Sequence, residues 1–137
     1  EVFDSHGGWT STAADLVRFA VAVDSKTKPL IRPESLTLLK SRPSFTDSDD
    51  KTWYGFGWSV RSVSGIDVVN LWHSGLIAGT STILVKRSDN LTWAVLFNVN
   101  DSKDGQTCST LIDRPMHAAV DHSIPLLPIG ELQQEAP

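Results

Sequence analysis

The chain has 137 residues, of which 40% are hydrophobic and 20% are charged, and its formal net charge is −4 at pH 7. A chain of this length fits a single domain and can bury a core of its own. The small acidic excess provides no basic surface for a phosphate backbone, so we expect no nucleic acid among its partners. The sequence contains no run of 18 apolar residues that would cross a bilayer.

Cys108 is the one cysteine, which excludes an intrachain disulfide. Its position in an expected helix favours a buried apolar thiol over a nucleophile. Residues 1–8 lack the charged and apolar regions of a signal peptide. We therefore interpret the chain as one that starts abruptly, as a fragment of a longer chain would.

Two helices are expected in the first third of the chain. Thr12 has the spacing of a helix cap relative to the acid that follows, and it predicts an amphipathic helix. The apolar residues of this helix recur at helical spacing, at Leu16, Phe19, Ala20 and Val23. A proline in the first turn predicts a second, shorter helix over Pro33–Lys40. The polar residues 44–52 then indicate an exposed loop.

The apolar period changes to two after this loop. Over Tyr54–Val60, apolar residues alternate with glycine and serine, which predicts a strand with one aromatic face and one bare face open to close packing. Three further strands are expected over Ile66–Ser74, Thr80–Lys86 and Leu91–Asn98. Hairpin residues join the last two strands at 88–90, and such short connections imply antiparallel neighbours.

A final helix follows a polar turn at residues 100–105. Its apolar side carries Cys108, Leu111, Ile112, Pro115 and Ala119. We expect Pro115 to kink or split this helix. Residues 124–137 contain prolines and a glycine and predict an irregular tail. The order of elements indicates an α+β fold, with an antiparallel sheet of about four strands flanked by helices.

Two His-x-Gly triplets occur, at residues 6–8 and 73–75. His6 precedes the first helix in a glycine-rich turn and is interpreted as part of a loop. His73 lies at the end of an expected strand, where the ordinary interpretation is a histidine on a sheet face. The triplet alone is a weak signal, so its neighbours in the sequence must decide between these alternatives.

Four stretches occur together in one order: GGWTSTAADLVRFA at 7–20, YGFGW at 54–58, HSGLIAGTSTILV at 73–85 and WAVLFN at 93–98. In combination they resemble the C-terminal part of the serine β-lactamase-like family. That family includes class C β-lactamases, penicillin-binding proteins, D-aminopeptidases and esterases. The resemblance covers residues 7 to about 120 and implies the C-terminal part of a β-lactamase/transpeptidase-like fold.

The resemblance implies a role for the second triplet. His73, Ser74 and Gly75 correspond to the third box of the family, which is Lys-Thr-Gly in many members and His-x-Gly in others, on the strand that lines the active site. In this family the backbone N–H that follows the box is an oxyanion-hole donor, which here belongs to Leu76. His73 would supply a polar edge to the site. Gly75 would leave room for a carbonyl oxygen, and Ser74 would be a hydrogen-bonding wall residue that binds substrate.

The other two boxes of the family are missing. Covalent catalysis there needs Ser-x-x-Lys at a helix start and Tyr-x-Asn or Tyr-x-Ser. The letters of the first box occur from Ser25 and from Ser48, both in polar loops, and we interpret both matches as chance. Tyr54, the one tyrosine, is followed by Gly-Phe. We therefore expect residues 1–123 to be the C-terminal segment of a catalytic domain whose nucleophile lies upstream. The alternative is a natural protein that retains only this half of the domain.

The main hypothesis is thus a serine hydrolase portion that is inactive alone. Its partners would be the N-terminal part of the same parent chain and a small acyl substrate, with an ester, amide or β-lactam bond. The histidines show no ligand spacing, so no metal and no cofactor is expected. The resemblance also implies a periplasmic or secreted parent. An alternative is a non-catalytic interaction module, in which an open sheet edge pairs with a partner or forms a homodimer.

Overall fold

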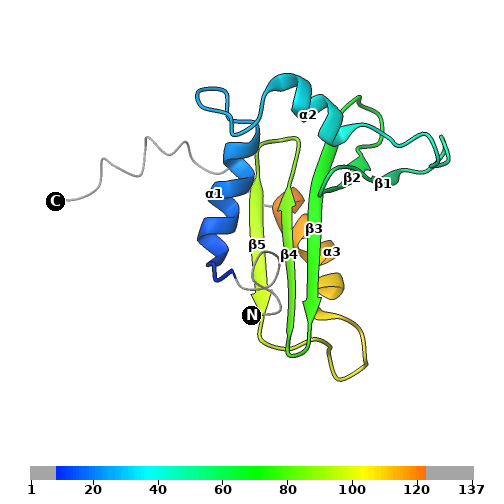
Figure 1. The fold of residues 1–137 in the computed structure, drawn as a ribbon. Coiled ribbons are helices and arrows are strands. Elements are labelled where there is room, and N and C mark those ends of the chain that lie inside the picture. The colour runs from blue at the N-terminus through cyan, green and yellow to red at the C-terminus, as the bar shows by residue number, and fades with distance from the viewer. Residues whose placement is uncertain (1–8, 123–137) are drawn as a thin grey trace.

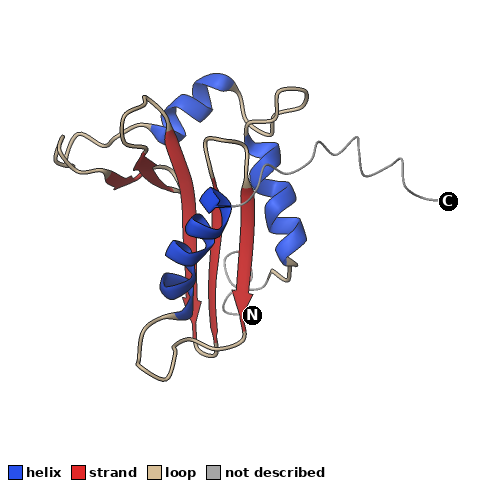
Figure 2. Cartoon of the chain, turned by 180° about the vertical axis from the view of Figure 1, so that it is seen from behind, coloured by secondary structure: helices blue, strands red, loops and turns tan. Residues whose placement is uncertain are grey.

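The computed structural model describes residues 9–122, which form an antiparallel sheet between two layers of helices. In chain order the elements are α1 (Ala13–Val23), α2 (Pro33–Lys40), β1 (Thr52–Tyr54), β2 (Ser59–Ser62), β3 (Val69–Ile77), β4 (Thr80–Lys86), β5 (Thr92–Phe97) and α3 (Cys108–His122). The strands lie in the order β1-β2-β3-β4-β5. Figure 1 shows α1 and α2 on one face of the sheet, and Figure 2 shows α3 on the other. This is the expected α+β class, with five strands where about four were predicted.

The first two helices begin and end close to where the sequence predicts. Thr12 is the N-cap of α1, and its hydroxyl accepts a hydrogen bond from the backbone N–H of Asp15 at 3.2 Å. Ala20 and Val23 are buried against the sheet, whereas the Phe19 side chain on the same stripe is half-exposed. Ala20 and Val23 are therefore the fully buried residues of this helix. No helix among residues 9–122 has the length and apolar character needed to span a bilayer.

The strand predicted over Tyr54–Val60 is wrong, because the chain turns between β1 and β2. An added Cβ at Gly55 would lie 2.1 Å from the backbone carbonyl oxygen of Leu39, and the N–H of Phe56 donates to that same oxygen at 3.2 Å. Gly57 has a φ of +75°, which continues the turn. The close packing expected at the bare glycine face does occur, but against the end of α2 and within a turn.

Strand β3 begins later than predicted and runs three residues further, to Ile77. The His-Ser-Gly triplet therefore lies inside the strand and not at its end. The connection to β4 is a two-residue turn in which Gly79 has a φ of +79°. Asn100 stabilises this turn by accepting from the N–H of Gly79 and donating to the carbonyl of Ile77 at 2.8 Å. The hairpin between β3 and β4 is thus held at its tip from the end of β5.

Two hydrophobic clusters hold the layers together, one on each face of the sheet. Trp58 is buried in the cluster beneath α1 and α2, and Trp93 is buried in the cluster beneath α3. Helix α3 is one element through Pro115 and is not split there, and Cys108 is only partly buried. The first histidine triplet and the tail at 124–137 lie outside the described residues.

Candidate functional site

His73 lies on β3 where the strand loses one of its two neighbours. The last pair between β3 and β2 is Trp72 with Ser59, whereas pairing with β4 continues to Ile77. Among the described residues, the stretch 73–77 therefore has a strand on one side only. The short β2 strand leaves a free sheet edge beside the triplet.

The backbone N–H of Leu76 points to this free edge. Backbone groups of alternate residues in an antiparallel strand face the same neighbour. The N–H of Val63 donates to the carbonyl of Val68 at 3.1 Å, which continues the β2–β3 ladder and orients Val68 toward β2. By alternation Trp72 also faces β2, while Ser74 and Leu76 face the side on which no described strand pairs. The N–H of Leu76 is therefore open to an acceptor from outside the sheet.

Gly75 lies directly across from Thr82 of β4. A Cβ built on Gly75 would lie 2.5 Å from the Thr82 hydroxyl oxygen. The bare position is thus filled partly by a side chain of the neighbouring strand. A glycine at this place has a packing reason in addition to the approach of a substrate carbonyl that the resemblance implies.

The hydroxyl of Tyr54 contacts His73, which the sequence did not predict. Tyr54 Oη lies 3.1 Å from His73 Nε2, and the two rings meet edge to face with centroids 6.0 Å apart. Tyr54 ends β1 just before the turn, and His73 is the first β3 residue beyond β2, so the two meet at the free edge. The pair is separated by 19 residues, and no local pattern signals such a contact.

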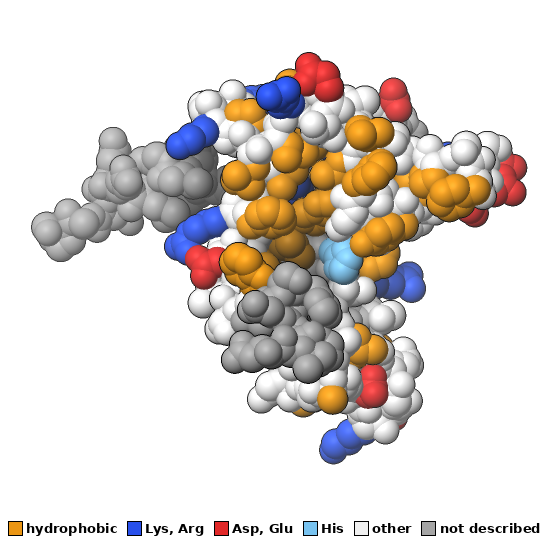
Figure 3. Space-filling view, viewed as in Figure 1, with side chains coloured by type: hydrophobic (Ala, Val, Ile, Leu, Met, Phe, Trp, Pro, Cys, Tyr) orange, Lys and Arg blue, Asp and Glu red, His pale blue; other side chains and the backbone are white. Residues whose placement is uncertain are grey.

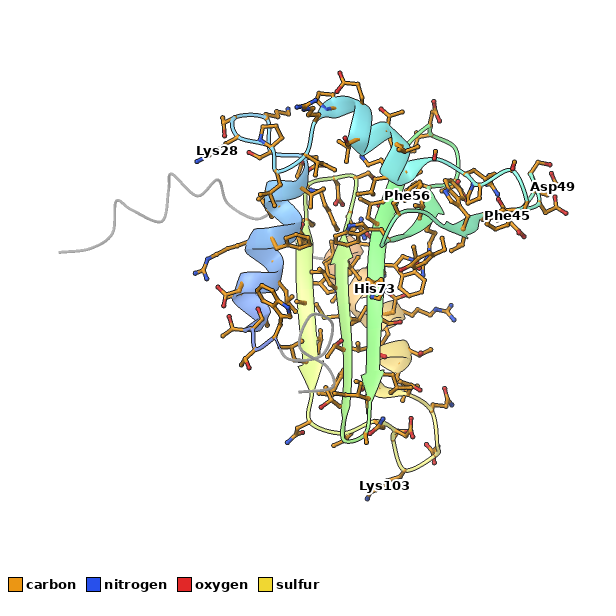
Figure 4. All side chains as sticks on the ribbon, in the orientation of Figure 1. Lys28, Phe45, Asp49, Phe56, His73 and Lys103 are labelled. Atoms are coloured by element: carbon orange, nitrogen blue, oxygen red, sulfur yellow. The ribbon has the colours of Figure 1, made fainter. Side chains whose placement is uncertain are left out.

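A groove of about 520 Å³ opens on the α1 and α2 side of the site. Its lining includes His73 and Gly75 from β3, Trp58 and Phe56 from the turn, and apolar residues of α1 and its following loop: Leu16, Phe19, Val23, Leu30 and Ile31. Figure 3 shows hydrophobic side chains gathered on this face, with a histidine at their border where Figure 4 labels His73. The groove is an apolar surface that borders one titratable side chain.

Ser74 lies apart from this groove. It lines a smaller cavity of about 170 Å³, together with Arg61, Ser109 and Asp113. The structure therefore brings His73 and Gly75 to one cavity and Ser74 to another.

The other serines weighed as nucleophiles have no catalytic surroundings. The Ser25 hydroxyl contacts Thr27 at 3.3 Å and accepts from the N–H of Lys28 at 3.3 Å. The Ser48 hydroxyl donates to Asp49 at 3.4 Å. Figure 4 labels Lys28 and Asp49 toward opposite ends of the molecule, with His73 between them. Neither serine lies at the start of a helix.

A cluster of charged residues lies on the opposite face of the sheet. Arg61 contacts Asp113 at 3.3 Å, and Arg87 donates to His117 Nδ1 at 3.1 Å and pairs with Asp121 at 2.7 Å. Burial lowers the pKa of His117 below its ordinary value, and the positive charge of Arg87 lowers this pKa further, while Asp113 opposes both. Across residues 9–122 no group of three His, Cys, Asp or Glu side chains could hold a metal ion.

Comparison with curated proteins and with solved structures gives no match. The sequence model of the Beta-lactamase family matches residues 2–114, which is most of the chain. That match spans the cap of α1, the free edge of β3 and the start of α3. The chain therefore belongs to the Beta-lactamase family.

Proposed function

We propose that this chain supplies the His-x-Gly strand and one oxyanion-hole donor of a serine hydrolase of the β-lactamase and penicillin-binding-protein type. The observation that carries the proposal is the N–H of Leu76, which faces a free strand edge three residues after His73. An N–H fixed in a strand is a preorganised donor for the negative oxygen that develops during acyl transfer. Membership of the Beta-lactamase family supports this chemistry over other uses of a free edge.

In the proposed site His73 polarises the edge on which the acyl group lies. Its exposed ring borders the groove, and Tyr54 fixes one of its nitrogens. Gly75 leaves the strand without a side chain beside the acyl carbon. Ser74, expected from the resemblance as a wall residue, is left out of this site because its side chain lines the separate cavity beside Arg61 and Asp113. It is not proposed as the nucleophile either, because no histidine or lysine among residues 9–122 forms a hydrogen bond to its hydroxyl that could activate it.

The nucleophile in this proposal comes from the N-terminal part of the same parent chain. A serine that attacks an acyl group must approach within about 3 to 3.5 Å of it, so its segment must pack beside His73. The groove offers that segment an apolar surface with the exposed side chains of Phe19, Leu30 and Phe56. Such a surface favours contact with an amphipathic element.

The proposal predicts that the 137-residue chain alone does not acylate. Intact mass would be measured after incubation with benzylpenicillin and, separately, with a fluorophosphonate probe. We expect no mass shift from either reagent while the chain is folded, because a lone oxyanion donor without a nucleophile opens no covalent route. Stoichiometric labelling would place a competent nucleophile within these residues and overturn this part of the proposal.

The oxyanion donor is tested by Leu76→Pro, in a longer chain that includes a Ser-x-x-Lys segment. Proline removes the N–H but breaks no ladder bond, because this N–H faces the free edge. We expect the acylation rate to fall by about 10² to 10³-fold, as for other single oxyanion donors. The matched control is Leu76→Ala, which changes the side chain and keeps the N–H. Equal rates in both variants would remove Leu76 from the proposed role.

A second candidate function uses the same free edge without catalysis. The backbone groups of Ser74 and Leu76, which face away from β4 and pair with no described strand, would pair with a strand of a partner or of a second copy. Light scattering of the folded chain separates the two candidates. A dimer that Leu76→Pro dissociates would favour edge pairing, and a monomer at high concentration would count against it.

A further inference from the structure

A second cavity adjoins the His73 site through two aromatic residues. It has a volume of about 460 Å³ and lies between β1 and the loop after α2. Phe56 lines both this cavity and the groove, and Tyr54 lines this cavity while its hydroxyl bonds His73. A ligand group that fills the cavity would therefore touch the side chain that holds His73. The volume lies within the range of small-molecule pockets.

Two of the three serine and threonine side chains that line this cavity, those of Ser41 and Thr46, already donate within the protein. The Ser41 hydroxyl donates to the carbonyl of Leu38 at 2.7 Å, and the Thr46 hydroxyl donates to the carbonyl of Pro43 at 2.6 Å. A polar ligand group would find these donors engaged. Phe45, in contrast, exposes 89% of its surface and offers an aromatic face.

The loop that carries Phe45 is organised by one arginine. Arg42 donates to the backbone carbonyls of Asp47 at 2.6 Å and Asp50 at 2.5 Å. Its guanidinium also lies 4.1 Å from the ring centre of Trp53, which anchors the loop to β1. The cavity wall is thus built before any ligand arrives, which lowers the ordering cost of binding.

We propose that this cavity is a subsite for an uncharged aromatic ring of the substrate that acylates at the His73 edge. The identity of the ligand as a substrate rests on the proposed function, whereas the preference for an aromatic ring rests on the cavity itself. Stacking on Phe45 and Phe56 favours a flat ring. Figure 4 shows Asp49 at the tip of the same loop as Phe45, and its carboxylate disfavours a negatively charged ring.

The subsite is tested by NMR titration of the full chain with phenylacetamide and, in parallel, with acetamide. We expect saturable shifts of the backbone amides of Phe45 and Phe56 with phenylacetamide, and none with acetamide at the same concentrations. Phe45→Ala should weaken phenylacetamide binding at least fivefold. Because Phe45 is so exposed, this variant should keep the native spectrum elsewhere.

The matched control is Phe19→Ala, which removes a half-exposed aromatic ring from the groove and leaves the subsite intact. Its affinity for phenylacetamide should stay within twofold of the parent chain. Absence of saturation, equal shifts with acetamide, or weakening by Phe19→Ala in place of Phe45→Ala would overturn the subsite. Saturable binding at Phe45 with no effect of Leu76→Pro on acylation would instead leave the subsite standing and overturn the proposed function.

Discussion

The phenolic oxygen of Tyr54 lies 3.1 Å from Nε2 of His73, across the free edge of β3. The phenol can donate to Nε2 or accept from Nε2–H, and donation requires that the neutral ring carries its proton on Nδ1. At His117, Arg87 can only donate to Nδ1, so the neutral ring carries its proton on Nε2. His117 therefore serves as an internal reference for the tautomer of His73.

Replacing Tyr54 by phenylalanine should change the tautomer of His73. Where the phenol is the donor, its removal takes away the hydrogen bond that favours the Nδ1–H form. The measurement is the pair of ¹⁵N shifts of each imidazole at a pH where the ring is neutral. We expect the His73 pair to move toward the Nε2–H pattern in Tyr54→Phe, while the His117 pair stays unchanged. Unchanged shifts of His73 would mean that the Tyr54 hydroxyl does not determine the tautomer.

Adding a methyl group to Gly75 should destabilise the fold through Thr82. The new Cβ would lie 2.5 Å from the Thr82 hydroxyl oxygen, so that side chain or the strand must move. We expect Gly75→Ala to lower the free energy of unfolding by about 1 to 3 kcal/mol, as for other overpacked sites. A double-mutant cycle in urea unfolding checks the cause: the loss should be smaller in a Thr82→Ala background. Equal losses in both backgrounds would assign the cost to the backbone of the strand.

Gly55→Ala should be more costly, because the obstacle is backbone and cannot rotate away. Its Cβ would lie 2.1 Å from the carbonyl oxygen of Leu39. We expect a loss of about 3 kcal/mol in the free energy of unfolding. The control is Gly105→Ala, which meets no atom within 4 Å but has a φ of +74°. Gly105→Ala should lower the free energy of unfolding by about 1 kcal/mol, because alanine is strained in the left-handed region. A loss in Gly55→Ala no larger than this would contradict the packing explanation.

Stability should fall as the solution is acidified through the titration of His117. Its pKa is below the ordinary 6.5, mainly because the ring is partly buried. The unfolded chain then binds more protons than the folded chain between these two pKa values, so stability rises with pH in that window. The contribution of His117 is complete above about pH 6.5 and declines as pH falls toward the lower folded value. Urea midpoints from pH 7.5 to 5 should therefore fall less steeply in His117→Gln than in the parent chain.

The sequence by itself determined the local elements and the family. Thr12 and the apolar period after it specify where α1 begins, because a cap and a 3.6-residue repeat are local properties. The hairpin residues at 88–90 likewise separate β4 from β5. The order of four short stretches indicated the family to which the chain belongs.

Only the tertiary structure decided what lies beside His73. The alternation over Tyr54–Val60 could not reveal the turn, because the carbonyl of Leu39 that packs on Gly55 comes from a different element. This turn shortens β2, and the short β2 frees the N–H of Leu76 and lets Tyr54 reach His73. Each of these contacts joins residues that are distant in the chain. A local sequence pattern therefore does not predict which backbone groups remain unpaired after the sheet has formed.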